Sequence, residues 1–489
     1  MRKLFEKYPL FLLLLPAFVV IHLEKELHGL VPYEFVYDRI IILFIIPPVI
    51  LCFWYLFLRS VSTASLMTLS CLLPFYYTGD LKSWLSTKFP HSFLHSYSFL
   101  LSLFAVMLLV LFFVVRKKRT VPGKLFLFLN TAIFLFIAVD LAIIFSTGSK
   151  NKYIMEGKND LSSRPCDTCH YPNIYYLIFD AYTSSNQLKN EHGYANEAME
   201  SYLLDKGFYT VKDSKSNYNY TAFSIGSTLN MNYIKNTDTT SKTTDREYLQ
   251  ALKLVYKNEV GTFLQNRNYK IFNHSLFTFN ANPTTIKHVD FWGFREIFDQ
   301  YNLLLKLYYD AGHNLPSWVK KLFKNKYFVN SPELRKGLSD TVYNHLLQTI
   351  KTKTDQPKFV YAHFLRPHPP YYYDSTGKML PNEHIISGEG YIHQVAYSNR
   401  LIKKIIDSIF IFSGEPTIII LQGDHGISFK DPVHIPDKFS NLNAIYFPNK
   451  DYGLLTDTVT SVNTFRIVLN TFFEQDLPLL PGKYYHLRQ

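Results

Sequence analysis

The sequence predicts an α/β domain with a mostly parallel sheet flanked by helices, preceded by an N-terminal region of five transmembrane helices. The long uncharged runs of the 489-residue chain nearly all fall before residue 147. Further along, short apolar runs alternate with longer runs of helical periodicity, which is typical of a parallel sheet covered by helices. Two of the short runs end at a carboxylate, and open α/β sheets form ligand crevices at the carboxyl ends of their strands.

Five hydrophobic segments predict the membrane helices, because each approaches the roughly 20 residues needed to cross a hydrocarbon core. They are residues 8–23, 40–58, 61–77, 97–115 and 125–145, within a transmembrane region 1–146. No small-residue cleavage site follows the first segment, so we expect it to stay as an anchor rather than to be removed as a signal peptide.

Basic residues predict the orientation of these helices. A cluster of four lies at 116–119, between the fourth and fifth segments, and others precede the first segment. Such residues face the cytoplasm, so an odd number of spans leaves the chain after residue 146 outside it. The net charge of +12 comes largely from these loops, and no arginine-rich stretch follows, so the expected partner is the lipid bilayer and not nucleic acid.

A polar stretch, 147–172, is predicted to link the membrane region to the catalytic domain 173–489. It contains Cys166 and Cys169, which we interpret as a small disulfide in an oxidising compartment. With His170 they also form the C-x-x-C-H pattern of haem attachment, although a predicted strand follows too closely for a helical haem envelope.

Four β-rich apolar runs are expected to form the sheet of the catalytic domain. They are 173–179, 358–365, 416–422 and 443–448. Between the second and third, residues 391–411 carry an apolar stripe at helical spacing. Strands that alternate with helices in this way predict a largely parallel sheet covered on both faces.

Asp180 follows the first of these strands, and Asp424 and His425 follow the third. Carboxylate oxygen and imidazole nitrogen are ligands for a divalent cation, which keeps a position open for the reacting group. The three residues therefore predict a metal site. For Asp180 alone, a helix N-cap is an equally reasonable interpretation.

Thr221 precedes an apolar-periodic run and marks the expected start of a helix. An alcohol becomes a useful nucleophile when a metal or base stabilises its alkoxide, and the helix N-terminus adds partial positive charge. Thr221 is therefore a candidate nucleophile and metal contact. A simple helix cap explains the same residue, and composition does not decide between the two.

Four further residues are candidates for substrate binding. Arg366 offers a planar donor fork for phosphate or sulfate oxygens, and the flanking His363 and His368 can donate to a leaving oxygen. His434, nine residues beyond His425, is a weaker candidate.

These motifs resemble the alkaline phosphatase superfamily, and specifically its membrane-anchored sulfatase-like branch. The segment Thr221-Ala222-Phe223-Ser224 is similar to the Thr-Ala-Val-Ser stretch of the phosphoethanolamine transferases, and Asp424-His425-Gly426 is similar to their metal-binding pair. His363 and His368 match the spacing of their His-x4-His stretch. Five spans before an extracytoplasmic domain also resemble the lipoteichoic acid synthases.

The resemblance implies an alkaline-phosphatase-like fold and a metal-dependent transfer of a head group through a covalent Thr221 intermediate. It implies a divalent cation held by Asp180, Thr221, Asp424 and His425, with Zn²⁺ and Mn²⁺ as the leading candidates. A second cation at the site is also compatible with the resemblance. The substrate is expected to be a phospholipid or another phosphodiester or sulfoester of the envelope, and the location the inner membrane of a bacterium.

The sequence departs from the sulfatases of this superfamily because it lacks their C/S-x-P-x-R segment, so sulfate ester hydrolysis is disfavoured. Its first predicted metal ligand is Asp180 where the transferases use Glu, which leaves donor and acceptor open. Two alternatives remain: a sulfatase-like hydrolase or phosphodiesterase with the same first step, and a catalytically silent envelope protein.

Overall fold

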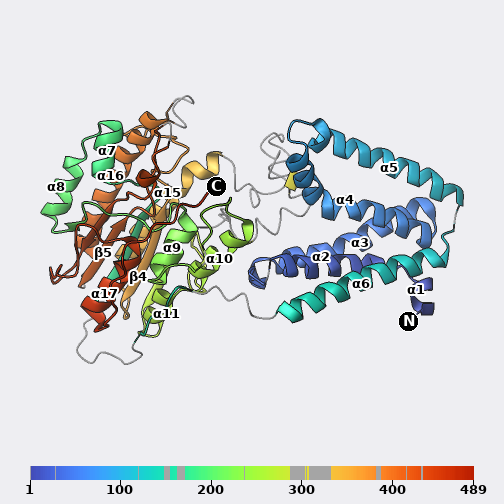
Figure 1. Cartoon of the computed structure of the whole chain (residues 1–489), viewed down its shortest axis with the longest axis horizontal. Coiled ribbons are helices and arrows are strands. Elements are labelled where there is room, and N and C mark those ends of the chain that lie inside the picture. Colours follow the sequence, from blue (N-terminus) through green and yellow to red (C-terminus); the bar gives the residue numbers. More distant parts are fainter. Residues whose placement is uncertain are drawn as a thin grey trace. The chain divides into compact units, whose positions relative to one another are not determined.

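The computed structural model divides the chain into two compact units (Figure 1). A membrane unit contains Met1–Lys152 and Trp292–Tyr327, and a catalytic unit contains Tyr153–Phe291 and Phe328–Gln489. The residues that the structure describes are 2–27, 29–118, 120–147, 155–161, 171–235, 237–286, 294, 303, 306–307, 332–380, 387–414, 416–430 and 433–488.

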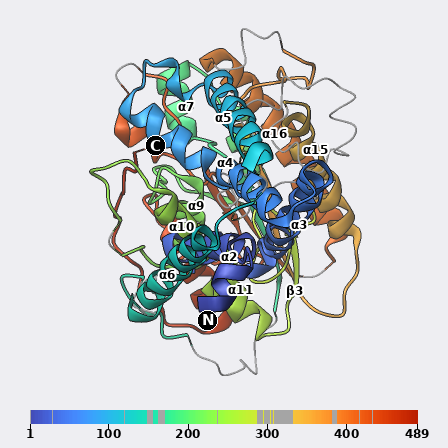
Figure 2. The same ribbon diagram turned by 90° about the vertical axis from the view of Figure 1, so that its right-hand side faces the viewer.

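Six helices make up most of the described part of the membrane unit (Figure 2), and the five predicted segments overlap the last five of them. The helices are α1 (Arg2–Lys7), α2 (Phe11–Glu26), α3 (Tyr37–Leu58), α4 (Val61–Lys88), α5 (Tyr97–Lys118) and α6 (Gly123–Thr147), with short 3₁₀ turns at Tyr33–Phe35 and Phe93–His95. Three of them, α3, α5 and α6, are long and apolar enough to cross a membrane. The chain is thus a membrane protein.

The other two helices differ from these three for identifiable reasons. Helix α2 has only 16 residues. Helix α4 has 28 residues but is less apolar, because it places small hydroxyl side chains such as Thr63, Ser65 and Thr68 in the interior of the unit. The Thr68 hydroxyl donates to the Ala64 carbonyl 2.9 Å away, so its polar group is satisfied within the helix. Small residues at such positions allow close packing between membrane helices.

Two polar residues of α6 hold α2 beside it. Near the start of both helices, the Asn130 amide donates to the carbonyls of Phe5 and Tyr8, 2.9 and 2.8 Å away, and accepts from the backbone N–H of Phe11. Ten residues further along α6, Asp140 contacts His22 and Lys25 near the end of α2. Both helices therefore run in the same direction.

A six-stranded mixed sheet forms the centre of the catalytic unit, in the order β2-β6-β5-β1-β4-β3. Its strands are β1 (Asn173–Phe179), β2 (Tyr209–Thr210), β3 (Lys270–His274), β4 (Lys358–Phe364), β5 (Thr417–Gln422) and β6 (Asn443–Tyr446). Four neighbouring strands, β5-β1-β4-β3, are parallel, in line with the largely parallel sheet that was predicted. The predicted strand β6 is instead antiparallel to β5, and β2 is antiparallel to β6. Strands β1, β4 and β5 are buried along their whole length.

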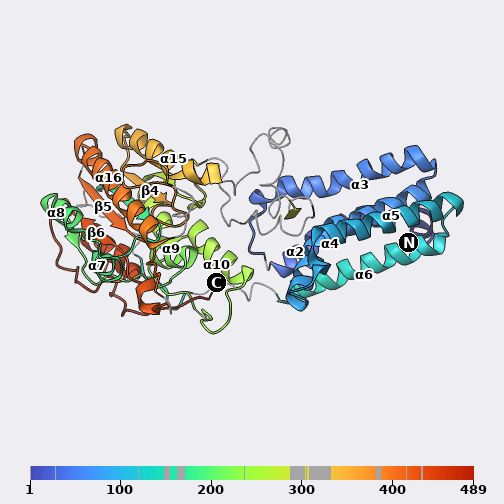
Figure 3. The same cartoon turned by 90° about the horizontal axis from the view of Figure 1, so that it is seen from above.

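Helices cover both faces of this sheet (Figures 1 and 3). One face carries α9 (Thr221–Leu229), α10 (Asp245–Tyr256), α11 (Glu259–Gln265) and α17 (Thr464–Phe473), and the Phe465 ring meets Tyr176 of β1 at 5.1 Å. The other face carries α7 (Ser185–His192), α8 (Glu197–Asp205), α15 (Pro332–Lys351) and α16 (Gly388–Phe412), and Phe410 meets Tyr446 of β6 at 4.9 Å. The sequence predicted this covered α/β architecture.

Part of the predicted linker packs on the catalytic unit. Met155 bridges to Ile234, and Glu156 accepts a hydrogen bond from the Tyr485 hydroxyl at 2.8 Å. Asn159 donates to the Asn230 carbonyl at 2.8 Å and is buried. Residues 155–161 therefore continue the catalytic unit.

Candidate active site

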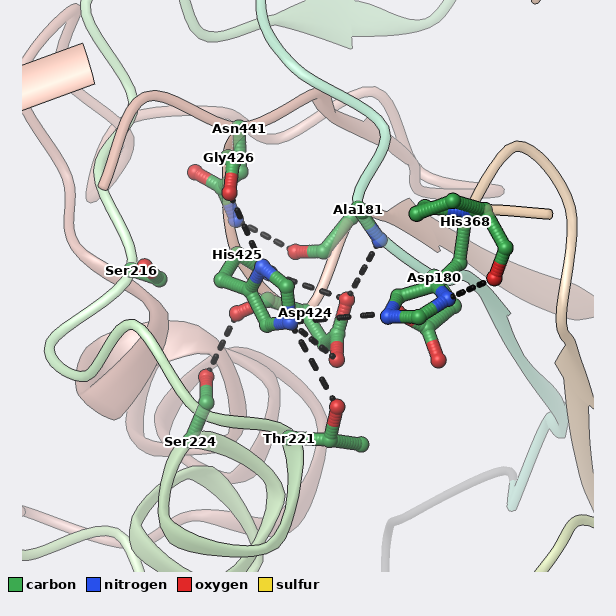
Figure 4. A network of polar contacts seen from close by, with 12 residues as sticks. Asp180, Ala181, Ser216, Thr221, Ser224, His368, Asp424, His425, Gly426 and Asn441 are labelled. Carbon is green, nitrogen blue, oxygen red and sulfur yellow. Dashed lines mark hydrogen bonds and ion pairs between the residues drawn. The ribbon is translucent and has the colours of Figure 1, made fainter. Parts of the chain in front are cut away.

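The predicted metal ligands meet at the carboxyl edge of the sheet (Figure 4). Asp180 directly follows β1, and Asp424 follows β5, which lies next to β1. His363 lies within β4 on the other side of β1, level with Ile178 in the strand register. One ligand atom from each of Asp180, His363 and Asp424 lies within 4.8 Å of the others, and all three residues are buried.

The separations between these side chains are too long for hydrogen bonds but suit ligands of one ion. Asp180 lies 3.6 Å from Nε2 of His363 and 3.8 Å from Nε2 of His425, and Asp424 lies 3.5 Å from Nε2 of His425. Two ligand atoms at tetrahedral positions around a zinc ion, each about 2.1 Å from it, are about 3.4 Å apart. The cluster therefore has the spacing of a cation site.

Burial without compensation supports the same interpretation. Oδ1 of Asp180, Oδ2 of Asp424 and Nε2 of His363 are buried and have no hydrogen-bond partner among the described residues. Leaving such groups unpaired costs about 1–3 kcal/mol each, and more when they are charged. A divalent cation would satisfy all three at once, and a set of carboxylates and imidazoles suits Zn²⁺ or Mn²⁺. These residues thus fit the predicted cofactor.

The other oxygen of Asp424 fixes the geometry of the edge. Oδ1 accepts from the backbone N–H groups of Ala181 and His425, both at 2.9 Å, and so joins the turn after β1 to the turn after β5. Gly423 makes this approach feasible, because a Cβ there would overlap the Tyr182 carbonyl oxygen. Asp180 does not cap a helix, since α7 is capped by the Ser184 hydroxyl.

His425 presents Nε2 to the cluster because its other ring nitrogen is occupied. Nδ1 lies 2.9 Å from the Gly426 carbonyl oxygen, which can only accept, so Nδ1 is the protonated nitrogen. Burial lowers the pKa of His425, but the Asp424 and Asp180 carboxylates outweigh burial and raise the pKa above its usual value. Burial raises the pKa of Asp180, yet His368, His363 and His425 together bring the pKa below its usual value.

Thr221 is the first residue of α9 and lies at the cluster. The N-cap position belongs to Tyr220, whose backbone is extended, so Thr221 is inside the helix and does not cap it. Its Oγ1 lies 3.4 Å from Nε2 of His425. One turn on, the Ser224 hydroxyl donates to the Asp424 carbonyl at 2.6 Å and anchors α9 to the turn that carries the ligands.

The candidate substrate residues are distributed unequally. His368 is exposed and lies close enough to Asp180 to lower the pKa of that carboxyl (Figure 4). Arg366 is instead buried, pairs with Asp340 at 2.9 Å and lies between two tyrosine rings, those of Tyr373 and Tyr397. The structure does not bring it into contact with the cluster.

His434 and the cysteine pair are not part of the cluster in the residues that the structure describes. His434 is exposed and pairs with Asp437 at 2.9 Å. Cys166 and Cys169 fall outside the described residues, so their predicted disulfide stays a prediction.

Sequence reasoning placed His363 at the substrate, whereas the structure places it among the potential ligands. Its Nδ1 lies 3.1 Å from the Tyr361 hydroxyl, which leaves Nε2 directed to Asp180. A histidine inside an otherwise apolar strand, one residue before its end, was the available signal. Tyr361, which orients this ring, gave none, because a tyrosine two residues earlier is an ordinary strand residue.

Comparison with known families identifies the chain. The model of the Sulfatase family matches residues 173–466, which is more than half of the sequence. The chain belongs to the sulfatase family. This membership confirms the resemblance to the alkaline phosphatase superfamily, and the sulfatase-family protein is an enzyme of this superfamily.

The comparison with solved structures finds transferases and a hydrolase at low sequence identity. Lipooligosaccharide phosphoethanolamine transferase A of Neisseria meningitidis, an integral membrane protein, is 13% identical over 96% of this chain and 95% of its own, with a TM-score of 0.41. The periplasmic domain of a phosphoethanolamine transferase from Campylobacter jejuni is 12% identical over 64% of this chain and 92% of its own, with a TM-score of 0.37. A phosphonate monoester hydrolase of Agrobacterium radiobacter is 11% identical over 62% of this chain and 73% of its own, with a TM-score of 0.38. No curated protein matches the sequence.

Proposed function

We propose that this enzyme transfers a phosphoryl-linked head group, of the phosphoethanolamine or phosphoglycerol type, from a phospholipid to an acceptor in the bacterial envelope. The observation that carries the proposal is the position of Thr221. Thr221 is the first residue of α9, and its hydroxyl oxygen lies 3.4 Å from Nε2 of His425. Buried carboxylate and imidazole atoms without hydrogen-bond partners among the described residues lie beside it. An alcohol in such surroundings is set up for attack on phosphorus.

In the proposed reaction, the Thr221 hydroxyl loses its proton to water, Oγ1 attacks phosphorus, and the bond from phosphorus to the diacylglycerol oxygen breaks. A divalent cation, Zn²⁺ or Mn²⁺, held by Asp180, Asp424 and His425 with His363 as a further ligand, would lower the pKa of the Thr221 hydroxyl and offset charge on the phosphoryl oxygens. The N-terminus of α9 adds partial positive charge at Thr221. His368, exposed beside Asp180, donates a proton to the departing oxygen.

The phosphothreonine then passes its group to an acceptor hydroxyl, which regenerates Thr221. In this scheme, Arg366 acts through the loop that carries His368, and His434 is a further residue that contacts the substrate. A second cation is an additional feature of the proposal. The absence of a C/S-x-P-x-R segment favours phosphoryl over sulfate ester chemistry.

We further propose that α2 and α4 cross the membrane together with α3, α5 and α6. Helix α2 runs in the same direction as α6, which is what a first and a fifth span require. With five spans, the basic cluster at 116–119 faces the cytoplasm and the domain from residue 173 to 489 lies outside it. The anchor would keep the active site near its lipid substrate in the inner membrane and raise the effective substrate concentration.

The family match supports a second candidate function, hydrolysis, in which water takes the place of the acceptor after the same first step. The purified full-length chain, incubated with fluorescent phosphatidylethanolamine and Zn²⁺ or Mn²⁺, separates the two. Release of diacylglycerol that requires an added envelope glycolipid supports transfer, and release without any acceptor supports hydrolysis.

A peptide-mapping experiment tests the covalent step directly. Mass spectrometry of the chain quenched during turnover should find the head-group phosphate on the peptide that contains Thr221, and should not find it after chelation of the metal. A modified peptide elsewhere, or turnover that survives Thr221→Ala, would overturn the proposal.

A further inference from the structure

A cavity of about 790 Å³ lies on the α7 and α8 side of the sheet, between α8 and strands β2 and β6. Its inner wall includes Ser184, four residues after Asp180, and Asn441, whose amide donates to the Gly423 carbonyl. Because β6 is antiparallel to β5, the residues that enter β6 lie at the same edge of the sheet as Asp424. Thr221 belongs to the opposite face, so the cavity is separate from the candidate active site.

The walls of the cavity combine an apolar floor with a polar rim. Phe208, Val211 and Leu442 form the floor and are all buried. Hydroxyl and carboxylate groups of α8 and β2 surround the floor, among them Ser201 and Thr210. A pyranose ring has the complementary chemistry, since its faces expose C–H groups and its edge carries hydroxyls. The volume also falls in the range of small-ligand sites, about 300–1,000 Å³.

The charges of the rim select among sugars. Asp457 is neutralised by Lys212, 3.4 Å away, and also accepts from the Tyr209 hydroxyl at 3.2 Å. Glu197 and Glu200 line the other wall, and neither is paired with a cation in the part of the chain that the structure describes. They are three residues apart on α8, so both carboxylates lie on one face of the helix and can reach one ammonium group.

We propose that this cavity binds a hydroxyl-rich ligand that carries an amine, such as an amino sugar of the envelope. Two unpaired carboxylates attract an ammonium and repel a phosphate or sulfate, so the site disfavours phosphorylated sugars. The proposal concerns binding, and it holds whether the enzyme transfers or hydrolyses. Carboxylates in the first turn of α8 also stabilise the helix dipole, and the test has to separate that role from binding.

Calorimetric titration of the full-length chain in detergent micelles provides this test. Glucosamine should bind saturably and about tenfold more tightly than glucose, whereas glucose 6-phosphate should not bind. Ethanolamine, which has the amine without the ring, should bind more weakly than glucosamine. Equal binding of ethanolamine and glucosamine would overturn the sugar assignment, and absence of saturable glucosamine binding would overturn the site.

Variants of α8 connect the binding to this cavity. The double substitution Glu197→Gln with Glu200→Gln should weaken glucosamine binding about tenfold and leave glucose binding unchanged, which also reports that the cavity is intact. Ser201→Trp should fill the cavity and abolish binding of both sugars. Asp205→Asn, on the same helix but outside the cavity, is the matched control and should bind like the wild type. Unchanged glucosamine binding in the double variant would refute the proposal.

Discussion

The membrane unit and the catalytic unit each bury a carboxylate beside a histidine, but only the carboxylate of the membrane unit has both oxygens within hydrogen-bond distance of basic side chains among the described residues. In the membrane unit, Asp140 lies 2.8 Å from Nδ1 of His22 and 3.0 Å from Nζ of Lys25, so both of its oxygens are paired. In the catalytic unit, Asp180 is separated from its histidines by 3.6 and 3.8 Å, and its Oδ1 has no hydrogen-bond partner among the described residues.

The two sites differ in how the buried charge is compensated. Ionised groups at hydrogen-bond distance compensate one another and can hold two helices together. Ionised groups that share a cluster yet stay beyond that distance require something else to compensate them, and a divalent cation does so. We therefore assign a structural role to Asp140 and a ligand role to Asp180, and the following experiments test that assignment.

The largest effect is expected at Thr221, which contributes chemistry without holding the cluster together. Thr221→Ala should reduce turnover about 10⁶-fold, the scale seen when a nucleophile is removed, and change the metal dissociation constant only a few-fold. Thr221→Ser should recover part of the rate. Thr228→Ala, on the same helix but bonded to the Ser224 carbonyl, is the matched control. A Thr221→Ala enzyme with normal turnover would remove Thr221 from the mechanism.

Replacement of Asp180 should separate metal binding from folding. Asp180→Asn should weaken metal affinity by about a hundredfold or more, because it removes a charged ligand. Without metal, the variant should be only slightly less stable than the wild type near neutral pH, because the lowered pKa of Asp180 means that its histidine neighbours already favour the ionised carboxylate in the folded state. Thermal unfolding with and without Zn²⁺ or Mn²⁺ measures both effects, because a ligand that binds only the folded state raises its stability. A large loss of metal-free stability would instead indicate a structural role for Asp180.

Metal affinity should depend on pH in a direction set by His425. The carboxylates of Asp424 and Asp180 raise the pKa of His425 above its usual value. As the pH falls, protonation of His425 therefore begins to compete with metal binding at a higher pH than for an ordinary histidine. Affinity should be constant above that pKa and fall about tenfold per pH unit below it. The pKa of Asp180 is lowered, so this carboxylate stays ionised throughout. Metal titrations at several pH values check the sign, and affinity that rises as the pH falls would contradict it.

The strands that sequence patterns predict best are those that are buried on both faces. Strands β1, β4 and β5 were predicted to within one residue at either end, because continuous apolar runs are bounded by polar residues there. Strand β2 has two residues and β3 begins and ends with polar side chains, so neither shows a strand pattern. They depend on pairing with β6 and β4, which no local pattern encodes.

The candidate site was predictable where chemistry follows a structural boundary. Asp180 and Asp424 come after strands and Thr221 begins a helix, so a general rule about sheet edges brings them together. His363 lies inside a strand and its ligand position follows from the register with β1. Arg366 pairs with Asp340 on α15, 26 residues earlier, and a partner at that distance leaves no local signal.

The smallest effect on catalysis is expected at Asp140, where the assignment to structure predicts lost stability. Asp140→Asn removes the charge that joins His22 and Lys25 of α2 to α6 and should destabilise the membrane unit by about 1–2 kcal/mol. Lys25 retains Glu26 at 3.0 Å and is partly exposed, which limits the loss.

Unfolding in detergent micelles, followed by circular dichroism, measures this loss of stability. Glu6→Gln, which breaks an exposed pair with Arg2, is the control and should change stability by less than about 0.5 kcal/mol. Turnover of a water-soluble phosphodiester should stay within about twofold of the wild type, because the Asp180 cluster is untouched. If Asp140→Asn instead abolished that turnover without unfolding the protein, compensated charge in the membrane unit would have a catalytic role, and pairing distance would no longer distinguish a structural cluster from a ligand site.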